Sequence, residues 1–168
     1  MNLKLIVFII IAITTMCSKP AMASWLDLFW GISPPLVEKF DPARQGVALD
    51  VEFKVKKKYG YRFKIEFLHK NNQWNELEEL IGSGKTQKGT ILPVHLVIMK
   101  KNLQVNELAF DELVETYGTI ESSSSSTVRA IGHATLTPGT YRATLKMLQD
   151  TPAITGISAN FVVDVRPK

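Results

Sequence analysis

The stretch Gly82-Ser-Gly-Lys-Thr86 has the residue types of a nucleotide-binding phosphate loop. Such a loop reads Gly-x-x-x-x-Gly-Lys-Ser/Thr, and its lysine and hydroxyl side chains hold phosphates and magnesium. The first glycine of that pattern falls on Glu79, whose carboxylate would repel phosphate. A phosphate loop also opens a helix, whereas here a predicted helix precedes the stretch and a proline-bearing strand follows it. The sequence therefore predicts no nucleotide binding, and we interpret the stretch as a helix stop and a link.

The three histidines, His69, His95 and His133, are the next candidates for chemistry. They are widely spaced and form no His-x-x-x-His pair, so the sequence predicts neither a metal site nor a cofactor. A site assembled across the fold stays open as an alternative. A cluster that includes His95 or His133 would favour an enzyme.

The serines do not have the setting of a nucleophile. A serine nucleophile usually sits on a sharp turn such as Gly-x-Ser-x-Gly. Gly82-Ser83-Gly84 is one residue short on each side. The run Ser122–Ser126 has no apolar content to bury and predicts a flexible loop. We therefore expect no catalytic residue.

The first 23 residues predict a signal peptide that is removed on export. Lys4 precedes an apolar run over Leu5–Ile13, and Ala21 and Ala23 stand at the two positions that signal peptidase recognises. The alternative, a transmembrane anchor, needs about 20 apolar residues, and this run is shorter. We expect cleavage after Ala23 and a periplasmic or secreted protein that meets the membrane only in transit.

The single cysteine, Cys17, leaves one alternative for the N-terminus. It could be the acylated cysteine of a lipoprotein, which would anchor the chain to a membrane. Lipoprotein signals usually place a small residue just before that cysteine and an apolar one three before, where this chain has Met16 and Thr14. Cleavage after Ala23 instead leaves a mature chain without any thiol or disulfide.

The mature chain is large enough for one domain with its own core. The whole chain has 20 Lys+Arg and 16 Asp+Glu, and the signal peptide contains only Lys4 and Lys19 of these. Eighteen basic against 16 acidic residues is not the strongly basic balance of a nucleic-acid-binding protein. We expect an N-terminal arm over 24–48, which begins with an aromatic-rich stretch, and a domain over 49–168.

Alternating apolar and polar residues predict strands in that domain. Residues 51–55 and 61–67 alternate strictly, and Gly60 between them predicts a hairpin. Its outer face is mostly basic, which is typical of a solvated surface. Apolar residues three and four apart predict a helix over Asn71–Ile81 that ends at Gly82. Thr90–Met99 is rich in Ile and Val and predicts a strand.

Two further segments complete the pattern. Asn106–Gly118 has the apolar spacing of a helix, although flanking strands would make a strand equally economical, and both stay open. Pro138 and Gly139 mark a turn, and Tyr141 then opens an alternating strand, as in the tyrosine corner of Greek-key sandwiches. About seven short strands and one short helix predict a mainly β protein, an immunoglobulin-like antiparallel β-sandwich.

Four segments, in this order behind a signal peptide, resemble the bacterial secreted family catalogued as domain of unknown function 5625. They are FDPARQGVALDVEFKV (40–55), ILPVHLVIM (91–99), AFDELVETYG (109–118) and LTPGTYRATLKMLQDTPAITGISANFVV (136–163). The resemblance implies a compact β-sandwich with a short helix, and it implies that 109–118 is a strand. Relatives are often lipoproteins, but the resemblance implies no activity and no functional residues.

These observations favour a non-enzymatic exported β-sandwich that binds an unknown protein partner in the cell envelope through its loops or a sheet face. One specific form is an inhibitor or immunity protein that neutralises a toxin or a hydrolase. The competing class is a carbohydrate-binding module or an enzyme whose site is built from scattered residues. We expect no cofactor, no nucleotide and no nucleic acid among its partners.

Overall fold

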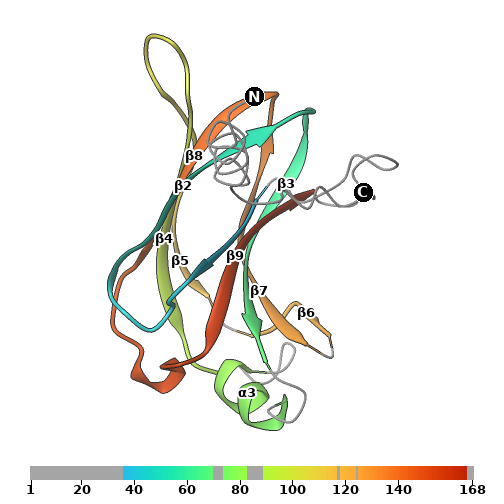
Figure 1. Ribbon diagram of the computed structural model, residues 1–168, viewed down its shortest axis with the longest axis vertical. Helices are drawn as coiled ribbons and strands as arrows, with labels where there is room; N and C mark the ends of the chain where they lie inside the picture. Colours follow the sequence, from blue (N-terminus) through green and yellow to red (C-terminus); the bar gives the residue numbers. More distant parts are fainter. Residues whose placement is uncertain (1–35, 70–73, 83–88, 117, 124, 166–168) are drawn as a thin grey trace, which may run out of the picture. The chain divides into compact units, whose positions relative to one another are not determined.

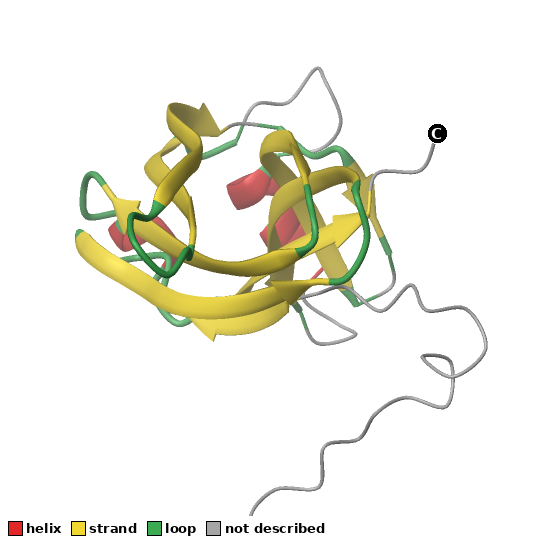
Figure 2. Ribbon diagram, turned by 90° about the horizontal axis from the view of Figure 1, so that it is seen from above, coloured by secondary structure: helices red, strands yellow, loops and turns green. Residues whose placement is uncertain are grey.

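Two antiparallel sheets pack face to face around one apolar core (Figures 1 and 2). The computed structural model describes residues 36–69, 74–82, 89–116, 118–123 and 125–165. A mainly β sandwich with one short α-helix, as the sequence predicted, is therefore confirmed. In the described part of the chain, no helix is long and apolar enough to cross a membrane.

The chain passes between the two sheets several times rather than filling one and then the other. The five-stranded sheet has the order β1-β9-β3-β7-β6, with bounds Leu36–Phe40, Ser158–Val165, Tyr59–Leu68, Ser126–Leu136 and Glu121–Ser122. The four-stranded sheet has the order β2-β8-β4-β5, with bounds Gly46–Val55, Gly139–Met147, Leu92–Lys100 and Glu107–Thr116. The helix α3 spans Trp74–Ile81, and a 3-10 turn, η1, spans Pro152–Ile154.

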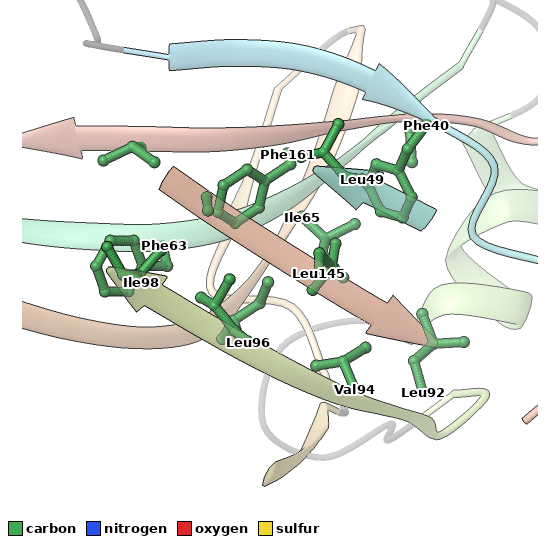
Figure 3. Close-up of a cluster of buried hydrophobic side chains, with 14 of the residues drawn as sticks. Phe40, Leu49, Phe63, Ile65, Leu92, Val94, Leu96, Ile98, Leu145 and Phe161 are labelled. Carbon is green, nitrogen blue, oxygen red and sulfur yellow. The ribbon is translucent and has the colours of Figure 1, made fainter. Parts of the chain in front are cut away.

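Period-two patterning builds the core, because alternate side chains of each strand point between the sheets. Inward residues of β3 and β9 meet inward residues of β4 and β8, as Figure 3 shows. The apolar side chains of these four strands with no exposed surface are Phe63, Ile65, Phe67, Ala159, Phe161, Val163, Leu92, Val94, Leu96, Ile98, Ala143 and Leu145. Burying each large apolar side chain contributes about 1.5–3 kcal/mol, so this layer is the main source of stability.

The predicted hairpin over residues 51–67 is wrong. β2 pairs with β8 in one sheet, and β3 pairs with β7 and β9 in the other. The chain therefore crosses from sheet to sheet at residues 56–58. Apolar and polar residues alternate in both strands as expected. The two strands lie in opposite sheets, so their apolar faces meet the core from opposite sides. Period-two patterning specifies which face is buried and not which strand lies next to it.

Within residues 106–118, Glu107–Thr116 form the strand β5 and not a helix, as the resemblance implied. β5 pairs with β4 over Glu107–Thr116. Phe110 and Thr116 are buried and Val114 is half-buried on the inner side, whereas Leu113 points outward. The helical spacing of the apolar residues is overridden because β4 supplies a full ladder of backbone partners.

The structure has nine strands rather than about seven, and two of them lie where the sequence predicted irregular chain. β1 falls inside the predicted N-terminal arm and pairs with β9, so the sandwich begins before residue 49. β6 and the start of β7 take up both ends of the serine run. Within that run, Ser123 Oγ accepts hydrogen bonds from the backbone N–H groups of Ser125 and Ser126.

The helix ends where the sequence predicted. It stops at Ile81, and Gly82 follows with a φ of 90°, a left-handed conformation that favours glycine. The described part of the helix starts at Trp74, so the predicted first turn from Asn71 lies outside the described residues. Lys85 and Thr86 of the phosphate-loop-like stretch also lie outside them.

Candidate functional site

The hairpin of β4 and β5 carries the most exposed apolar surface of the sheets. We call its outward-facing side chains the hairpin face: Pro93, His95, Val97, Met99, Leu108, Asp111, Leu113 and Glu115. Leu113 is 70% exposed and Leu108 is 56% exposed. Leu108 lies beside Met99, and Leu113 lies beside His95, in the strand register. Leu113 therefore lies near one end of the hairpin face and Leu108 with Met99 near the other, with Val97 and Asp111 between them.

β5 is the outer strand of its sheet, so one side of its backbone is not used by the sheet. Its strand partner among the described residues is β4 alone. A bulge between Phe110 and Leu108 breaks the register with β4. The strand carries four acidic residues and no basic one. Bulges and charges are common devices that stop an edge strand from pairing with copies of itself.

His95 and Asp111 form a histidine–carboxylate contact across the hairpin face. His95 Nε2 lies 2.6 Å from Asp111 Oδ1 across the two strands. In the strand register, the neighbours of His95 are Leu113 on one side and Lys146 on the other. No hydroxyl group of the described residues makes a hydrogen bond to this pair, so the geometry orients an imidazole without presenting it to a nucleophile.

The three histidines that the sequence singled out are not brought together. His95 lies on the four-stranded sheet, and His133 lies on the five-stranded sheet opposite Arg62. His69 follows β3, and its backbone N–H donates to the carbonyl of Ser125. Among the described residues, no group of three His, Cys, Asp or Glu side chains is placed to hold a metal ion.

The basic face that the sequence predicted for β3 is neutralised within the fold. The Lys64 ammonium donates to Asp164 of β9 and lies 3.5 Å from Glu121 of β6. Arg62 donates to Asp164 through two nitrogens and to Glu121 at 2.7 Å. Lys64 is itself buried. Two cations share two carboxylates here, so this face offers little unpaired charge to an anionic ligand.

The turn at Pro138 and Gly139 leads into a hydrogen-bonded tyrosine. The buried Tyr141 hydroxyl donates to the carbonyl of Thr137 at 2.9 Å and accepts from the Thr137 backbone N–H at 3.2 Å. This is the backbone contact of a tyrosine corner. Its ring stacks on Phe53 of the neighbouring strand at a centroid distance of 5.6 Å. Pro138, Gly139 and Tyr141 therefore shape the crossing from β7 to β8.

A second tyrosine of the same kind was not predicted. The Tyr61 hydroxyl donates to the carbonyl of Lys57, four residues earlier, at 2.9 Å. Burial raises the pKa of the Tyr61 hydroxyl above its usual value of 10. Lys57 lies in the crossing from β2 to β3, so each of these two sheet crossings is tied by a tyrosine four residues on. The spacing of a tyrosine just after a loop and opening a strand is the signal that could have found it.

Arg129 of β7 is a buried residue that sequence reasoning missed. It is fully buried, and its Nη1 donates to the carbonyls of Thr90 and Thr116 at 2.6 and 3.1 Å. Its Nη2 donates to the carbonyl of Ile81, the last residue of α3. Its guanidinium lies over the Phe67 ring, 5.7 Å from the centroid. One cation thus joins the end of α3, the approach to β4 and the end of β5.

Burial lowers the pKa of Arg129 to about 10, so the side chain stays protonated at neutral pH. No carboxylate of the described residues pairs with it. Backbone carbonyls, including one at the negative end of the α3 dipole, therefore supply all of its described hydrogen-bond acceptors. This arrangement identifies Arg129 as a structural residue rather than a ligand-binding one.

Three residues that the sequence analysis singled out lie outside the described residues. Ala21 and Ala23, the predicted signal-peptidase positions, and Cys17, the alternative acylation site, precede residue 36. The roles of these residues in signal-peptide cleavage and acylation remain predictions.

Comparison with known proteins decides the family. A family model described as Domain of unknown function (DUF5625) matches residues 38–165, from β1 to the end of β9. The chain belongs to the DUF5625 family. This confirms the resemblance on which the strand at 109–118 rested. No curated protein matches the DUF5625 chain.

A solved structure has the same fold as this DUF5625 protein. The crystal structure of GEBA250068378 from Sulfurospirillum deleyianum is similar to it with a TM-score of 0.65. The likeness covers 80% of this chain and 99% of that chain, at 15% sequence identity. An identity this low shows a shared fold and carries no statement about activity.

Proposed function

We propose that this DUF5625 protein is an exported, non-enzymatic β-sandwich that binds a protein partner through the hairpin face. The observation that carries the proposal is the exposure of Leu108 and Leu113 on an edge strand. Large apolar side chains on a sheet face most often mark an interaction surface when they lie next to one another. Here Met99 and Val97 of β4 extend the patch beside them.

The chemistry of the hairpin face favours a protein partner over a small ligand. The face is the outer side of a sheet, and protein interfaces combine an apolar centre with a polar rim. Leu113 on one side and Leu108 with Met99 on the other would contact the partner around the His95–Asp111 pair, which lies between them in the strand register, and the acidic residues at the two ends of β5 would form the rim. The outer side of the β5 backbone adds unpaired N–H and C=O groups, which an extended partner segment can use.

The non-enzymatic part of the proposal is supported by the placement of the titratable groups. His95 and His133 lie on different sheets, and the paired charges of Arg62 and Lys64 are satisfied by Asp164 and Glu121. A catalytic site needs a nucleophile or base with a perturbed environment next to a substrate position. The described groups are instead paired with one another on open sheet faces.

A photo-reactive amino acid introduced in place of Leu113 tests the proposal in the native host. We expect a single cross-linked adduct with another protein, and we expect Leu108→Asp to abolish it because a carboxylate would be buried in the interface. The matched control is the same photo-reactive group in place of His133, which is exposed on the opposite sheet. The identity of the cross-linked protein then separates a toxin or hydrolase inhibitor from other binding modules.

Three outcomes would contradict the proposal. The first is the absence of an adduct at position 113, and the second is an equal adduct at position 133. The third is an adduct that survives Leu108→Asp while circular dichroism shows the variant to be folded. Leu108 is more than half exposed, so its replacement should leave the free energy of unfolding within about 0.5 kcal/mol.

A further inference from the structure

The loop that joins β4 to β5 projects past the end of the sandwich and exposes two apolar side chains (Figure 1). Every residue from Lys101 to Leu108 is exposed. Leu103 is fully exposed and Val105 is 76% exposed. The residues between and beside them are uncharged amides, in the sequence Asn102-Leu-Gln-Val-Asn106. The tip of the molecule is therefore apolar and neutral.

Several lysines lie near this loop at the same end of the sandwich, beside the carboxylates of Glu52 and Glu107. Lys101 at the base of the loop donates to Glu52 of β2, which places the loop beside the end of that strand. β2 runs on to Lys54 and to the turn Lys56–Lys58, all exposed. No described carboxylate forms an ion pair with Lys54 or with the three lysines of the turn. We call this set, with Lys100, Lys101, Leu103 and Val105, the basic end.

We propose that the basic end binds the surface of an anionic phospholipid membrane. Leu103 and Val105 enter the boundary between headgroups and acyl chains, and the lysines face the phosphates. An apolar loop close to several lysines has the composition of interfacial membrane-binding elements. This proposal stands independently of the protein-binding hairpin face and of the alternative that Cys17 is acylated.

Charge and shape favour a membrane over the other occupants of this surface. A second copy would bring two sets of unpaired lysines together, and like charges across an interface are costly. An acidic protein partner would offer charges at fixed points, whereas these lysines are spread over two separate loops on flexible side chains. A lipid surface presents charge as a continuous plane and accepts a protruding tip without a matching cavity.

Co-sedimentation with vesicles tests the proposal with the mature chain from Ser24 onward. Its strands and its core lie within residues 36–165, so the chain folds without the signal segment. The probes are vesicles of phosphatidylglycerol and phosphatidylcholine in equal parts, and vesicles of phosphatidylcholine alone. We expect at least roughly tenfold tighter binding to the anionic vesicles, and a loss of that binding at about 0.5 M NaCl.

Two variants separate insertion from simple charge attraction. Leu103→Ser with Val105→Ser should weaken binding to anionic vesicles by roughly tenfold, because the apolar contribution is lost. Leu113→Ser is the matched control, since Leu113 is as exposed but lies on the sheet, and it should leave vesicle binding unchanged. Replacing Lys56, Lys57 and Lys58 by Gln should also weaken binding by roughly tenfold or more.

The proposal is overturned by any of three results. These are no binding to anionic vesicles, equal binding by the Leu103→Ser/Val105→Ser variant, and an equal loss in Leu113→Ser. The cross-linking result at Leu113 is independent of all three, so the two proposals fail separately. Thermal unfolding of each variant distinguishes lost binding from lost structure.

Discussion

Replacing Arg129 by methionine removes the only described cation at the junction of α3, β4 and β5. Methionine has a similar length, so it keeps the apolar contact with Phe67 while it removes the guanidinium. The carbonyls of Ile81, Thr90 and Thr116 then lose a charged hydrogen-bond donor. We expect the helix end of the sandwich, where these three carbonyls meet, to loosen first.

The size of the effect follows from the contacts. A hydrogen bond to a charged group contributes about 1.5–3 kcal/mol, so the three together amount to roughly 4–9 kcal/mol. Removing the guanidinium also ends the penalty for burying it, which is several kcal/mol. The free energy of unfolding should therefore fall by about 3 kcal/mol, and the melting temperature of a chain this size by about 10 °C.

Urea unfolding followed by circular dichroism measures this difference. The matched control is Arg142→Met, because Arg142 is exposed and pairs with Asp50 on the outer face of β8 and β2. That exposed pair contributes little to stability, because solvent screens it. Hydrogen exchange should also show faster exchange in α3 and at the end of β5 for Arg129→Met, with the central strands less affected.

Equal losses of stability in Arg129→Met and Arg142→Met would refute the reasoning, since they would mean that burial of the Arg129 hydrogen bonds adds nothing. Arg129→Lys provides a second test of the same hydrogen bonds. It keeps the charge but cannot reach three carbonyls with one planar group. We expect its stability to lie between those of the wild-type protein and Arg129→Met.

The remaining predictions concern the corners and the core. Tyr141→Phe and Tyr61→Phe should each lower the free energy of unfolding by about 1 kcal/mol, because each removes a buried hydroxyl that donates to backbone. Tyr59→Phe, at an exposed position, is the control, and an equal cost there in urea unfolding would contradict the prediction. Gly132→Ala should cost about 2 kcal/mol, because the added Cβ would lie 2.4 Å from Cζ of Phe110. Phe110→Leu in the same chain should recover part of that loss; no recovery would argue against the clash.

The buried faces of the strands could be predicted from the sequence, because alternation marks them directly. The inward residues of β3, Tyr61, Phe63, Ile65 and Phe67, are all buried as the alternation indicated. The pairing of strands could not be predicted, since alternation is the same whichever strand lies alongside. The false hairpin of residues 51–67 has this cause, whereas the pairing of β1 with β9 was missed because residues 36–40 were assigned to the N-terminal arm.

The candidate site was less accessible to prediction than the fold. The helical interpretation of residues 106–118 grouped Leu113 with Phe110 and Val114, which would have buried it. The strand places Leu113 on the opposite side, and only then does the hairpin face exist. Arg129 was missed for a different reason, because an arginine in an alternating segment looks like a solvated residue unless its acceptors are known. Those acceptors lie far away in the sequence.

The pairing of the first strands with the last ones sets when this chain can fold. β1 and β3 both pair with β9, and β2 pairs with β8, so the first three strands find these partners only near the end of the chain. Distant pairing of this kind slows folding, because long loops must close before these contacts form. A chain emerging from the ribosome therefore cannot complete either sheet until β8 and β9 are available. For a chain exported as its N-terminus predicts, this delay would keep the sandwich open during passage through a membrane.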